Sequence, residues 1–355
     1  MRKQSSSKKK TTFLILIIIA LAVVAAVEWV WLSKSVEVIK VERAAKSIPE
    51  LAPIPDTAFG PAVDSEKGYL VEEIDDGLYW VTEGTYHVMF LTTGEGVIVV
   101  DAPPSIGENI LKAIEETTDE PITHVIYSHS HADHIAAASM YPEDAIYIAH
   151  EETASRLARE GSFEFGLFVG GSDVPDPTIT FSDSYTLTVG TQTLELEYKG
   201  PAHRPGNIFI YAPKQKVLMF IDVIFPGWTP FKWLAVAEDV PAFIDAHDWV
   251  LSYDFDTLIS GHVGRLGTRE DVETQKEYIL DTQANAATAL QTVDFNAIAK
   301  EVGFENVWLL FNTYLNAVGE ECARLTEEKW VGRLAAVDVF NKSHCDKLAE
   351  SLRID

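Results

Sequence analysis

A short run of histidines and an aspartate constrains this chain more than any other feature of its sequence. Residues 128–134 read SHSHADH, which places His129, His131, Asp133 and His134 within six residues. Imidazole nitrogens and carboxylate oxygens are the ligands that suit zinc and neighbouring divalent metals. The run follows a strand pattern at 122–129 and precedes an Ala-rich helical pattern at 134–141. On such a turn, alternate side chains can converge on one metal while those between them reach a second.

Further polar residues stand at the ends of apolar strand patterns. His203 follows TLELEYKGPA, Asp222 ends KVLMFID, His262 follows DTLISG, and Asp101 ends VIVVD. Ligand sites in α/β folds lie beyond the strand ends, because loops converge there while the sheet holds them in place. We therefore expect these side chains to bind a metal or to support a ligand.

The order of strand and helix patterns predicts an α/β fold. Short apolar runs from Tyr69 to about residue 103 are separated by Gly-containing turns, which indicates antiparallel hairpins. Helical patterns at 108–118, 151–160 and 240–252 alternate with strand patterns at 122–129, 177–223 and 256–262. The chain from about 268 onward has a helical pattern throughout. This order predicts two mixed β-sheets faced by helices.

The motifs around the histidine run resemble those of a known family. HSHADH is similar to the HxHxDH signature of the metallo-β-lactamase superfamily, and GPAHRPGN, FID and SGH resemble its later ligand motifs in the right order. VVDAP looks like the superfamily's early strand that ends in Asp. The resemblance covers roughly residues 69–265 and implies a four-layer αββα sandwich.

The resemblance also implies a role for each matching residue. His129, His131 and His203 would bind a first metal ion, and Asp133, His134 and His262 a second. Asp222 would bridge the two ions, and Asp101 would orient a ligand imidazole through a hydrogen bond. One lactamase class of the superfamily has Cys where this chain has Asp222. A bridging Asp instead resembles the glyoxalase-II-like, lactonase and nuclease branches.

Two divalent metal ions, Zn²⁺ first with Fe or Mn as alternatives, would share a hydroxide that attacks a carbonyl-type small-molecule substrate. The expected substrate is a lactone, ester, thioester or β-lactam, with Asp133 or Asp222 handling the proton. Two alternatives stay open. One is a mono-iron sulfur-oxidising enzyme of the same fold, and the other is a non-catalytic anchored scaffold.

The first part of the chain predicts export. Residues 1–12 form a basic tail, and residues 13–32 are almost wholly apolar. About 20 residues in a helix can span a bilayer core. This segment is either a transmembrane signal anchor, which we favour because the apolar run continues past Ala26, or a cleaved signal peptide. The catalytic domain would then be membrane-anchored on the extracytoplasmic side, or secreted.

The remaining chain divides into three predicted parts: a Pro-containing linker at 33–68, the catalytic domain at 69–282, and a C-terminal helical extension at 283–355. The apolar residues 308–311 make a homo-oligomer interface one use of that extension. Cys322 and Cys345 are expected to be two buried thiols, with a single disulfide as the alternative.

Charge and the other polar residues narrow the function. The net charge is −26, although the first 12 residues carry five cations. Such an acidic body should repel nucleic acid, which requires Lys and Arg for its phosphates. Arg204 and Arg265 are expected to form surface salt bridges rather than to bind a substrate anion. Two further groups complete the predictions: aromatic residues that either wall a pocket or pack a loop (Phe225, Trp228, Phe231 and Trp233), and histidines taken as structural (His87, His124, His150, His247 and His344).

Overall fold

The computed structural model describes residues 50–160 and 174–355. The predicted tail 1–12, the predicted membrane segment 13–32 and the linker up to residue 49 lie outside the described residues. Among the helices that are described, none is both long and apolar enough to cross a membrane.

The described chain alternates strands and helices before it ends in helices. The strands are β1 (Leu70–Asp75), β2 (Leu78–Thr82), β3 (His87–Thr92), β4 (Val97–Val100), β5 (Ile122–Ile126), β6 (Ile146–His150), β7 (Ile179–Phe181), β8 (Ser184–Val189), β9 (Gln192–Glu197), β10 (Phe209–Ala212), β11 (Val217–Met219) and β12 (Thr257–Ile259). The helices are α2 (Asn109–Thr117), α3 (Ala132–Ile135), α4 (Glu151–Glu160), α5 (Lys232–Val236), α6 (Val240–Leu251), α7 (Arg269–Thr292), α8 (Phe295–Val302), α9 (Val307–Trp330) and α10 (Val337–Ile354), with short 3₁₀ turns at Asp56–Ala58 and Ala138–Met140.

Most predicted elements are confirmed, with two differences. Helices α2, α4 and α6 occupy the predicted helical patterns. Strand β6 had not been predicted, because five residues carry too little periodicity to stand out. The Ala-rich stretch after His134 is not one helix, since α3 stops at Ile135 and a 3₁₀ turn follows.

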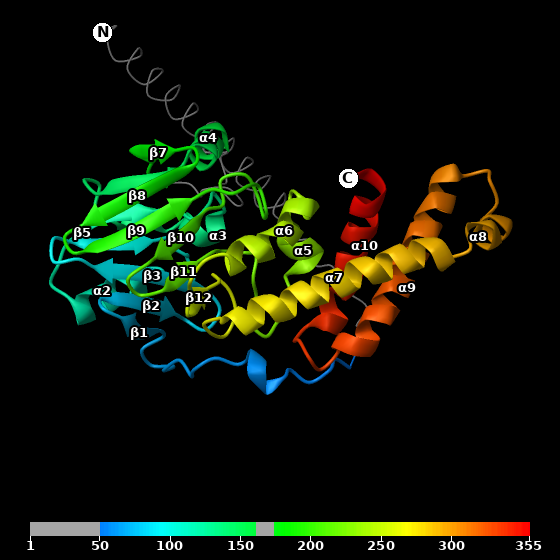
Figure 1. Cartoon of the computed structure of the whole chain (residues 1–355), viewed down its shortest axis with the longest axis horizontal. Coiled ribbons are helices and arrows are strands. Elements are labelled where there is room, and N and C mark those ends of the chain that lie inside the picture. Colours follow the sequence, from blue (N-terminus) through cyan, green and yellow to red (C-terminus); the bar gives the residue numbers. More distant parts are fainter. Residues whose placement is uncertain (1–49, 161–173) are drawn as a thin grey trace, which may run out of the picture. The chain divides into compact units, whose positions relative to one another are not determined.

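The strands form two mixed sheets, as predicted (Figure 1). The first has the order β1-β2-β3-β4-β5-β6-β7, antiparallel through β4 and parallel from β4 to β7. The second has the order β12-β11-β10-β9-β8, in which only the β11–β12 pair is parallel.

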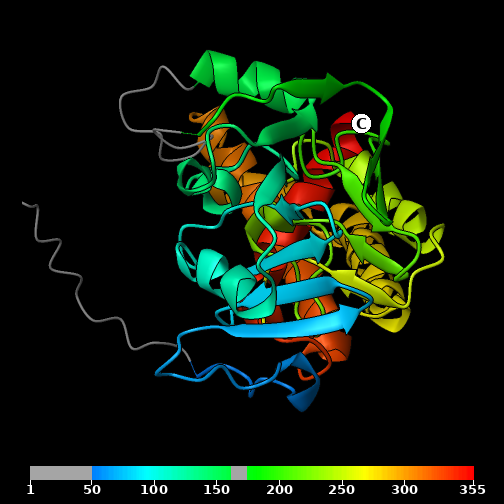
Figure 2. The same ribbon diagram turned by 90° about the vertical axis from the view of Figure 1, so that its left-hand side faces the viewer.

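Alternating side chains explain why these sheets stack. In β3, Val88 and Phe90 pack in one cluster with α2, while Met89 and Leu91 pack in another with the second sheet. A strand has a side-chain period of two, so a strand buried on both faces supplies two cores. A third cluster covers the far face of the second sheet with α6, α7, α9 and α10. Helix, sheet, sheet and helix are therefore stacked in four layers (Figure 2).

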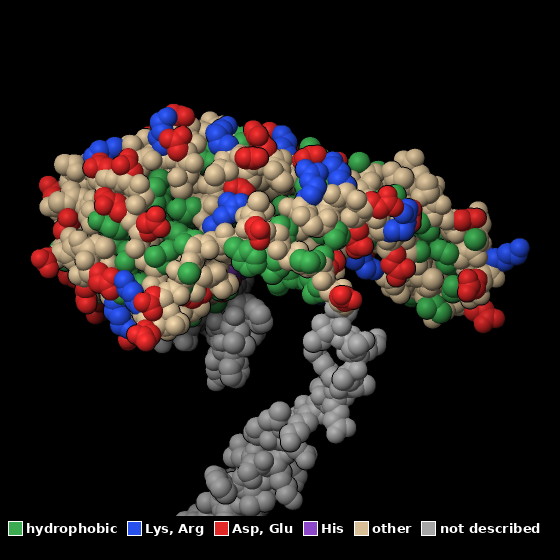
Figure 3. Space-filling model, turned by 90° about the horizontal axis from the view of Figure 1, so that it is seen from below, with side chains coloured by type: hydrophobic (Ala, Val, Ile, Leu, Met, Phe, Trp, Pro, Cys, Tyr) green, Lys and Arg blue, Asp and Glu red, His purple; other side chains and the backbone are tan. Residues whose placement is uncertain are grey.

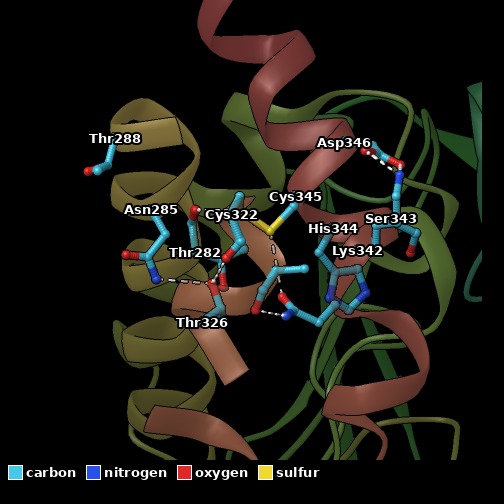
Figure 4. Close-up of a disulfide and its surroundings, with 12 residues drawn as sticks. Thr282, Asn285, Thr288, Cys322, Thr326, Lys342, Ser343, His344, Cys345 and Asp346 are labelled. Carbon is cyan, nitrogen blue, oxygen red and sulfur yellow. Dashed lines mark hydrogen bonds and ion pairs between the residues drawn. A yellow bond between two sulfur atoms is a disulfide. The ribbon is translucent and has the colours of Figure 1, made fainter. Parts of the chain in front are cut away.

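The C-terminal helices share the third core with the second sheet. Helix α7 runs without a break through the predicted boundary at 282–283, and α9 and α10 pack against it. Cys322 of α9 and Cys345 of α10 form a disulfide (Figure 4). The expectation of two buried thiols is therefore wrong. Spacing alone could not show that two neighbouring helices bring these residues together.

The described part of the predicted linker lies against the body. The Ala52 amide donates to Asp338 at 2.6 Å, and the Trp228 indole donates to the Ala58 carbonyl at 3.0 Å. The Arg265 guanidinium donates to the Thr57 carbonyl at 2.6 Å. These bonds join residues 52–58, here called the arm, to loops and helices that are far away in the sequence.

Helix α5 contains a left-handed turn. Residues 233–236 (WLAV) have φ values of 58°, 56°, 55° and 51° and include no glycine. A left-handed turn costs L-residues about 1–2 kcal/mol each. Burial of Leu234 and Ala235 in the third core helps to offset this cost. The Trp233 amide also donates to the Ser343 hydroxyl at 3.0 Å.

Candidate metal centre

Seven predicted ligand side chains meet at one edge of the two sheets. His129 and His131 follow β5, and Asp133 and His134 lie within α3. His203 comes from the loop after β9, and Asp222 and His262 follow β11 and β12. Because β11 and β12 are parallel, their carboxyl ends deliver these two residues to the same edge.

A first group of donors surrounds one oxygen of Asp222. Asp222 Oδ2 lies 3.3 Å from His129 Nε2, 3.8 Å from His131 Nδ1 and 3.4 Å from His203 Nε2. Donors held about 2.1 Å from a tetrahedral zinc ion lie about 3.4 Å from one another. The spacing of these atoms therefore fits a single metal ion.

A second group surrounds the other oxygen of the same carboxylate. Asp222 Oδ1 lies 3.2 Å from His134 Nε2 and 2.9 Å from His262 Nε2. Asp133 Oδ2 completes the group at 3.7 Å from His134 and 3.8 Å from His262. The donor atoms within each group all lie within 4.8 Å of one another. Asp222 thus stands between the two groups, as a bridging residue would.

The backbone fixes this position of Asp222. Its φ is 66°, in the left-handed region that Asp tolerates better than most residues. Its amide donates to the Ser260 carbonyl at 3.2 Å, which ties the end of β11 to the end of β12. The side chain is almost fully buried, so it has little freedom to turn away.

Burial and charge give the two groups different electrostatics. Burial lowers the pKa of His203 to about 3 and that of His129 well below its usual range, which keeps both imidazoles neutral as ligands must be. His134 behaves differently: burial opposes its protonation, but Asp222, Asp133 and Asp101 raise its pKa to about 9. The carboxylates around His134 therefore favour positive charge at this position.

Several buried polar atoms of the centre have no hydrogen-bond partner. They include His129 Nε2 and Asp222 Oδ1, both directed at the cluster, and the hydroxyl of Ser130. Buried polar atoms in proteins are nearly always paired, because an unpaired one costs about 1–3 kcal/mol. The donor set and its unpaired atoms fit divalent metal ions.

Asp101 supports the centre through the backbone. Its Oδ1 accepts the Ser128 amide at 2.7 Å, one residue before His129. Burial raises the pKa of Asp101 to about 6, against the opposing influence of His134. The predicted hydrogen bond to a ligand imidazole is not formed in the described structure, where both Asp101 Oδ2 and His134 Nδ1 lack a partner.

Tyr86 also belongs to the site and was not predicted. Its hydroxyl donates to Asp133 Oδ2 at 3.1 Å, and its ring centre lies 4.5 Å from that of His262. Burial and the neighbouring Asp133 raise its pKa, so the hydroxyl keeps its proton. A lone Tyr in a hairpin turn gives no sequence signal. Only the isolated bridge between Tyr86 and His262 brings it to the metal centre.

The two arginines form ion pairs, as predicted, but not both at the surface. Arg265 binds Asp271 through two bonds of 2.6 and 2.9 Å. Arg204 Nε lies 3.8 Å from Glu238, but Arg204 is buried, so this pair is not a surface one.

The four aromatic residues have separate roles. Phe225 is buried and stacks 6.1 Å from the His262 ring, whereas Trp228 holds the arm at Ala58. Phe231 and Trp233 are about half exposed and lie beside α10. Phe225 alone of the four therefore borders the metal centre.

The remaining histidines lie outside both ligand groups. His150 and His247 contact main-chain carbonyls, and His344 lies between the Tyr278 hydroxyl and the Phe231 carbonyl. Thr123 contacts His124. His87 is fully buried against Trp80, and burial lowers its pKa to about 3.

The fold and the donor set define a metal-binding α/β sandwich. The family model of the metallo-beta-lactamase superfamily matches residues 81–275, more than half of the chain. The chain therefore belongs to the metallo-β-lactamase superfamily.

Individual relatives are more distant. The alpha subunit of 2,4-dinitroanisole O-demethylase from Nocardioides sp. is 27% identical, over 70% of this chain and 74% of that protein. A linear primary-alkylsulfatase from Pseudomonas sp. is 22% identical, over 50% of this chain and 42% of its own length. This chain therefore matches less than half of the alkylsulfatase.

Solved structures share the fold. A metallo-beta-lactamase from Pontibacter korlensis aligns over 59% of this chain and 99% of its own, with a TM-score of 0.50 and 18% identity. The sec-alkylsulfatase Pisa1 from Pseudomonas sp. aligns over 79% of this chain and 50% of its own, with a TM-score of 0.55 and 17% identity. The alignment with the sulfatase covers more of this chain than the family model does, so the shared fold extends beyond residues 81–275.

Proposed function

We propose that this protein is a dinuclear metal-dependent hydrolase. The observation that carries the proposal is the division of Asp222, whose two oxygens face two separate groups of ligand-type side chains. The superfamily membership and the hydrolases among its relatives support it. Zinc is the ion we expect first, because the six donor residues other than Asp222 are five histidines and one aspartate.

Bound divalent ions would supply an activated water and polarise the substrate oxygen. The side chains would do the remaining work. His129, His131 and His203 would hold one ion, and His134, His262 and Asp133 the other. Asp222 would fix their separation.

Asp133 would move the proton. Its side chain is 47% exposed, whereas that of Asp222 is 7% exposed, so Asp133 alone faces solvent. Its Oδ2 accepts the Tyr86 hydroxyl, which would hold the carboxylate in position as it takes up a proton during hydrolysis.

The proposed substrate is a carbonyl-type small molecule: a lactone, ester, thioester or β-lactam. Phe225 beside His262 supports a partly apolar substrate. A second candidate is cleavage of an activated aryl methyl ether. It is favoured by the demethylase subunit, whose sequence match covers 70% of this chain, against 50% for the linear primary-alkylsulfatase.

Charge argues against nucleic acid as a substrate. On the face shown in Figure 3, Lys and Arg side chains are interspersed with Asp and Glu and form no continuous stripe. The net charge of −26 would add repulsion of phosphates.

We also propose that the enzyme works outside the cytoplasm, anchored through residues 13–32 or secreted. The disulfide between Cys322 and Cys345 supports this, because disulfides persist in oxidising compartments. A homo-oligomer through the α8–α9 end remains part of the proposal, since Trp308 is 83% exposed and Phe304 68%.

The test is metal content per chain of the purified full-length protein, beside an Asp222→Ala variant. About two zinc ions per chain that fall sharply in the variant would support the proposal. A panel of lactones, esters, thioesters, β-lactams and 2,4-dinitroanisole would then define the substrate class. One iron per chain would favour a mono-iron oxidising enzyme. No metal after reconstitution would leave the scaffold alternative.

A further inference from the structure

A cavity separate from the metal centre lies between α5, α9 and α10. Its volume is about 400 Å³, within the range of small-molecule sites. Trp233 and Val236 of α5 form one side, Leu315 of α9 another, and Ala349 and Arg353 of α10 a third. Helices α5 and α10 run beside each other here (Figure 1). None of the seven metal-centre side chains lines this cavity.

The left-handed turn gives the cavity its apolar wall. Leu234 and Ala235 point into the protein core, whereas Trp233 and Val236 are 47% and 44% exposed. An unusual backbone of four non-glycine residues therefore presents an indole and an isopropyl group to the cavity. Strained backbone of this kind concentrates at ligand-binding sites, where the surrounding structure holds it.

The charges around the cavity leave a cation uncompensated. Asp346 pairs with Lys342 at 2.9 Å, and Glu350 lies 3.9 Å from Lys347. In the part of the chain that the structure describes, no carboxylate lies within ion-pair distance of Arg353. A guanidinium beside an apolar wall suits a ligand with a carboxylate, which Arg binds through two parallel hydrogen bonds.

We propose that this cavity binds a small carboxylate with an aromatic or similarly flat apolar body. The carboxylate pairs with Arg353, and the apolar body packs against Trp233, Val236 and Leu315. The proposal does not depend on the metal centre or on the reaction performed there.

The cavity is nevertheless joined to the metal centre by a short path along the backbone. Ala237 lines the cavity, and the amide of the next residue, Glu238, donates to the His203 carbonyl at 2.8 Å. The cavity wall is thus one residue away in sequence from a backbone contact to His203, so the experiment must separate the two sites.

The experiment is a calorimetric titration of the full-length protein with 2-naphthoate, and with 2-naphthylmethanol as the uncharged counterpart. We expect saturable binding of one naphthoate with Kd near 0.1 mM, on the order of small-ligand affinities. The alcohol should bind at least about tenfold more weakly, because it lacks the charge that pairs with arginine.

Variants locate the site. Arg353→Gln and Trp233→Ala should each weaken naphthoate binding by about tenfold. Arg324→Gln, on the exposed surface of α9 away from the cavity, is the matched control and should leave Kd unchanged. Thermal melting checks that the variants are folded.

Naphthoate could also bind to the metal ions through its carboxylate. The titration is therefore repeated on protein from which EDTA has removed the metal. Equal naphthoate affinity with and without metal supports the cavity. Binding that requires metal, binding that Arg353→Gln and Arg324→Gln affect equally, or no binding up to about 1 mM would overturn the proposal.

Discussion

The metal centre and the helical region from α7 to α10 differ in whether their buried polar side chains are hydrogen-bonded. In the metal centre, His129, His134, His203 and Asp222 each have a buried atom without a hydrogen-bond partner. From residue 269 onward, no described side chain has such an atom. Tyr278 bonds to His344, and Asn341 donates to the Ala323 carbonyl at 2.8 Å.

The difference separates what stabilises the fold from what gives it function. Unpaired buried polar atoms cost about 1–3 kcal/mol each, and metal ions bound at the centre would offset that cost for the atoms that face them. The helices bury a continuous core in which every described buried side-chain N and O atom is paired, and a disulfide joins two of them. Changes in the two regions should therefore affect different measurements.

The largest effect should come from Asp222→Asn. The amide cannot give an anionic oxygen to both ligand groups, so bound metal should fall from about two ions to one or none per chain. The catalytic rate on whichever substrate is found should fall by about 10³-fold, since each ion contributes several kcal/mol to the barrier. Elemental analysis and steady-state kinetics measure both.

Asp254→Asn removes a carboxylate from the surface and is the control. It should leave both values unchanged. An Asp222→Asn variant that keeps two ions and full activity would contradict the assignment of Asp222 as the bridge.

Loss of the disulfide should lower the free energy of unfolding and leave metal binding unchanged. Replacing both cysteines, Cys322→Ser with Cys345→Ser, frees a loop with a sequence separation of 23. Loop closure of that length predicts a loss of about 3 kcal/mol in the free energy of unfolding. Denaturant unfolding measures the loss, while metal content should stay as in the native protein. A fall in metal content of the folded variant would show that the two regions are coupled.

Acid should weaken the helical region through His344. Burial lowers its pKa to about 4, below the value of about 6.5 expected in the unfolded chain. The unfolded state then binds more protons, so stability is present above pH 6.5 and is lost as the pH falls toward 4. At pH 5 the loss attributable to His344 is about 2 kcal/mol.

Urea unfolding at pH 7.5 and pH 5 measures this difference. In His344→Gln the pH dependence should shrink by that amount, whatever the variant's stability at neutral pH. Identical pH dependence in both proteins would exclude His344 as a contributor.

The smallest predicted effect is a substitution to glycine that raises stability, whereas glycine usually lowers it. Val236→Gly should stabilise the protein by about 1 kcal/mol, because glycine accepts a φ of 51° without strain. Val339 is also exposed but lies within right-handed α10, so Val339→Gly should destabilise the protein by about 0.5 kcal/mol. If both variants lose stability equally in thermal unfolding, the left-handed turn is not a source of strain.

The metal centre was predictable because its residues carry their own signal. The HSHADH run is local, and His203, Asp222 and His262 each follow an apolar strand, so the pattern indicated residues that could bind metal. Their individual roles came from the resemblance to the superfamily's motifs. Strand and helix periods predicted two mixed sheets faced by helices, and the resemblance to the superfamily implied the four layers. Tyr86 was not predictable, because its place depends on pairing with His262 across the fold.

Other features depend on tertiary packing that no local pattern encodes. The segment KWLAV at 232–236 has no glycine to indicate a left-handed turn, which arises where α5 meets the core and Ser343. The pairing of Cys322 with Cys345 depends on how two helices lie against each other. Helix α7 extends past residue 282 because its apolar face continues along the third core.

The bond between Cys322 and Cys345 also closes part of the backbone into a ring (Figure 4). The turn between α9 and α10, where Gly332 and Arg333 are exposed, lies inside this ring. A protease that cuts there would leave both pieces joined, and the cut protein would keep its mass until a reductant separates them. A cut before Cys322, outside the ring, has no such covalent tether. A single cut in the turn between α9 and α10 therefore releases no fragment, because the disulfide still joins the two pieces.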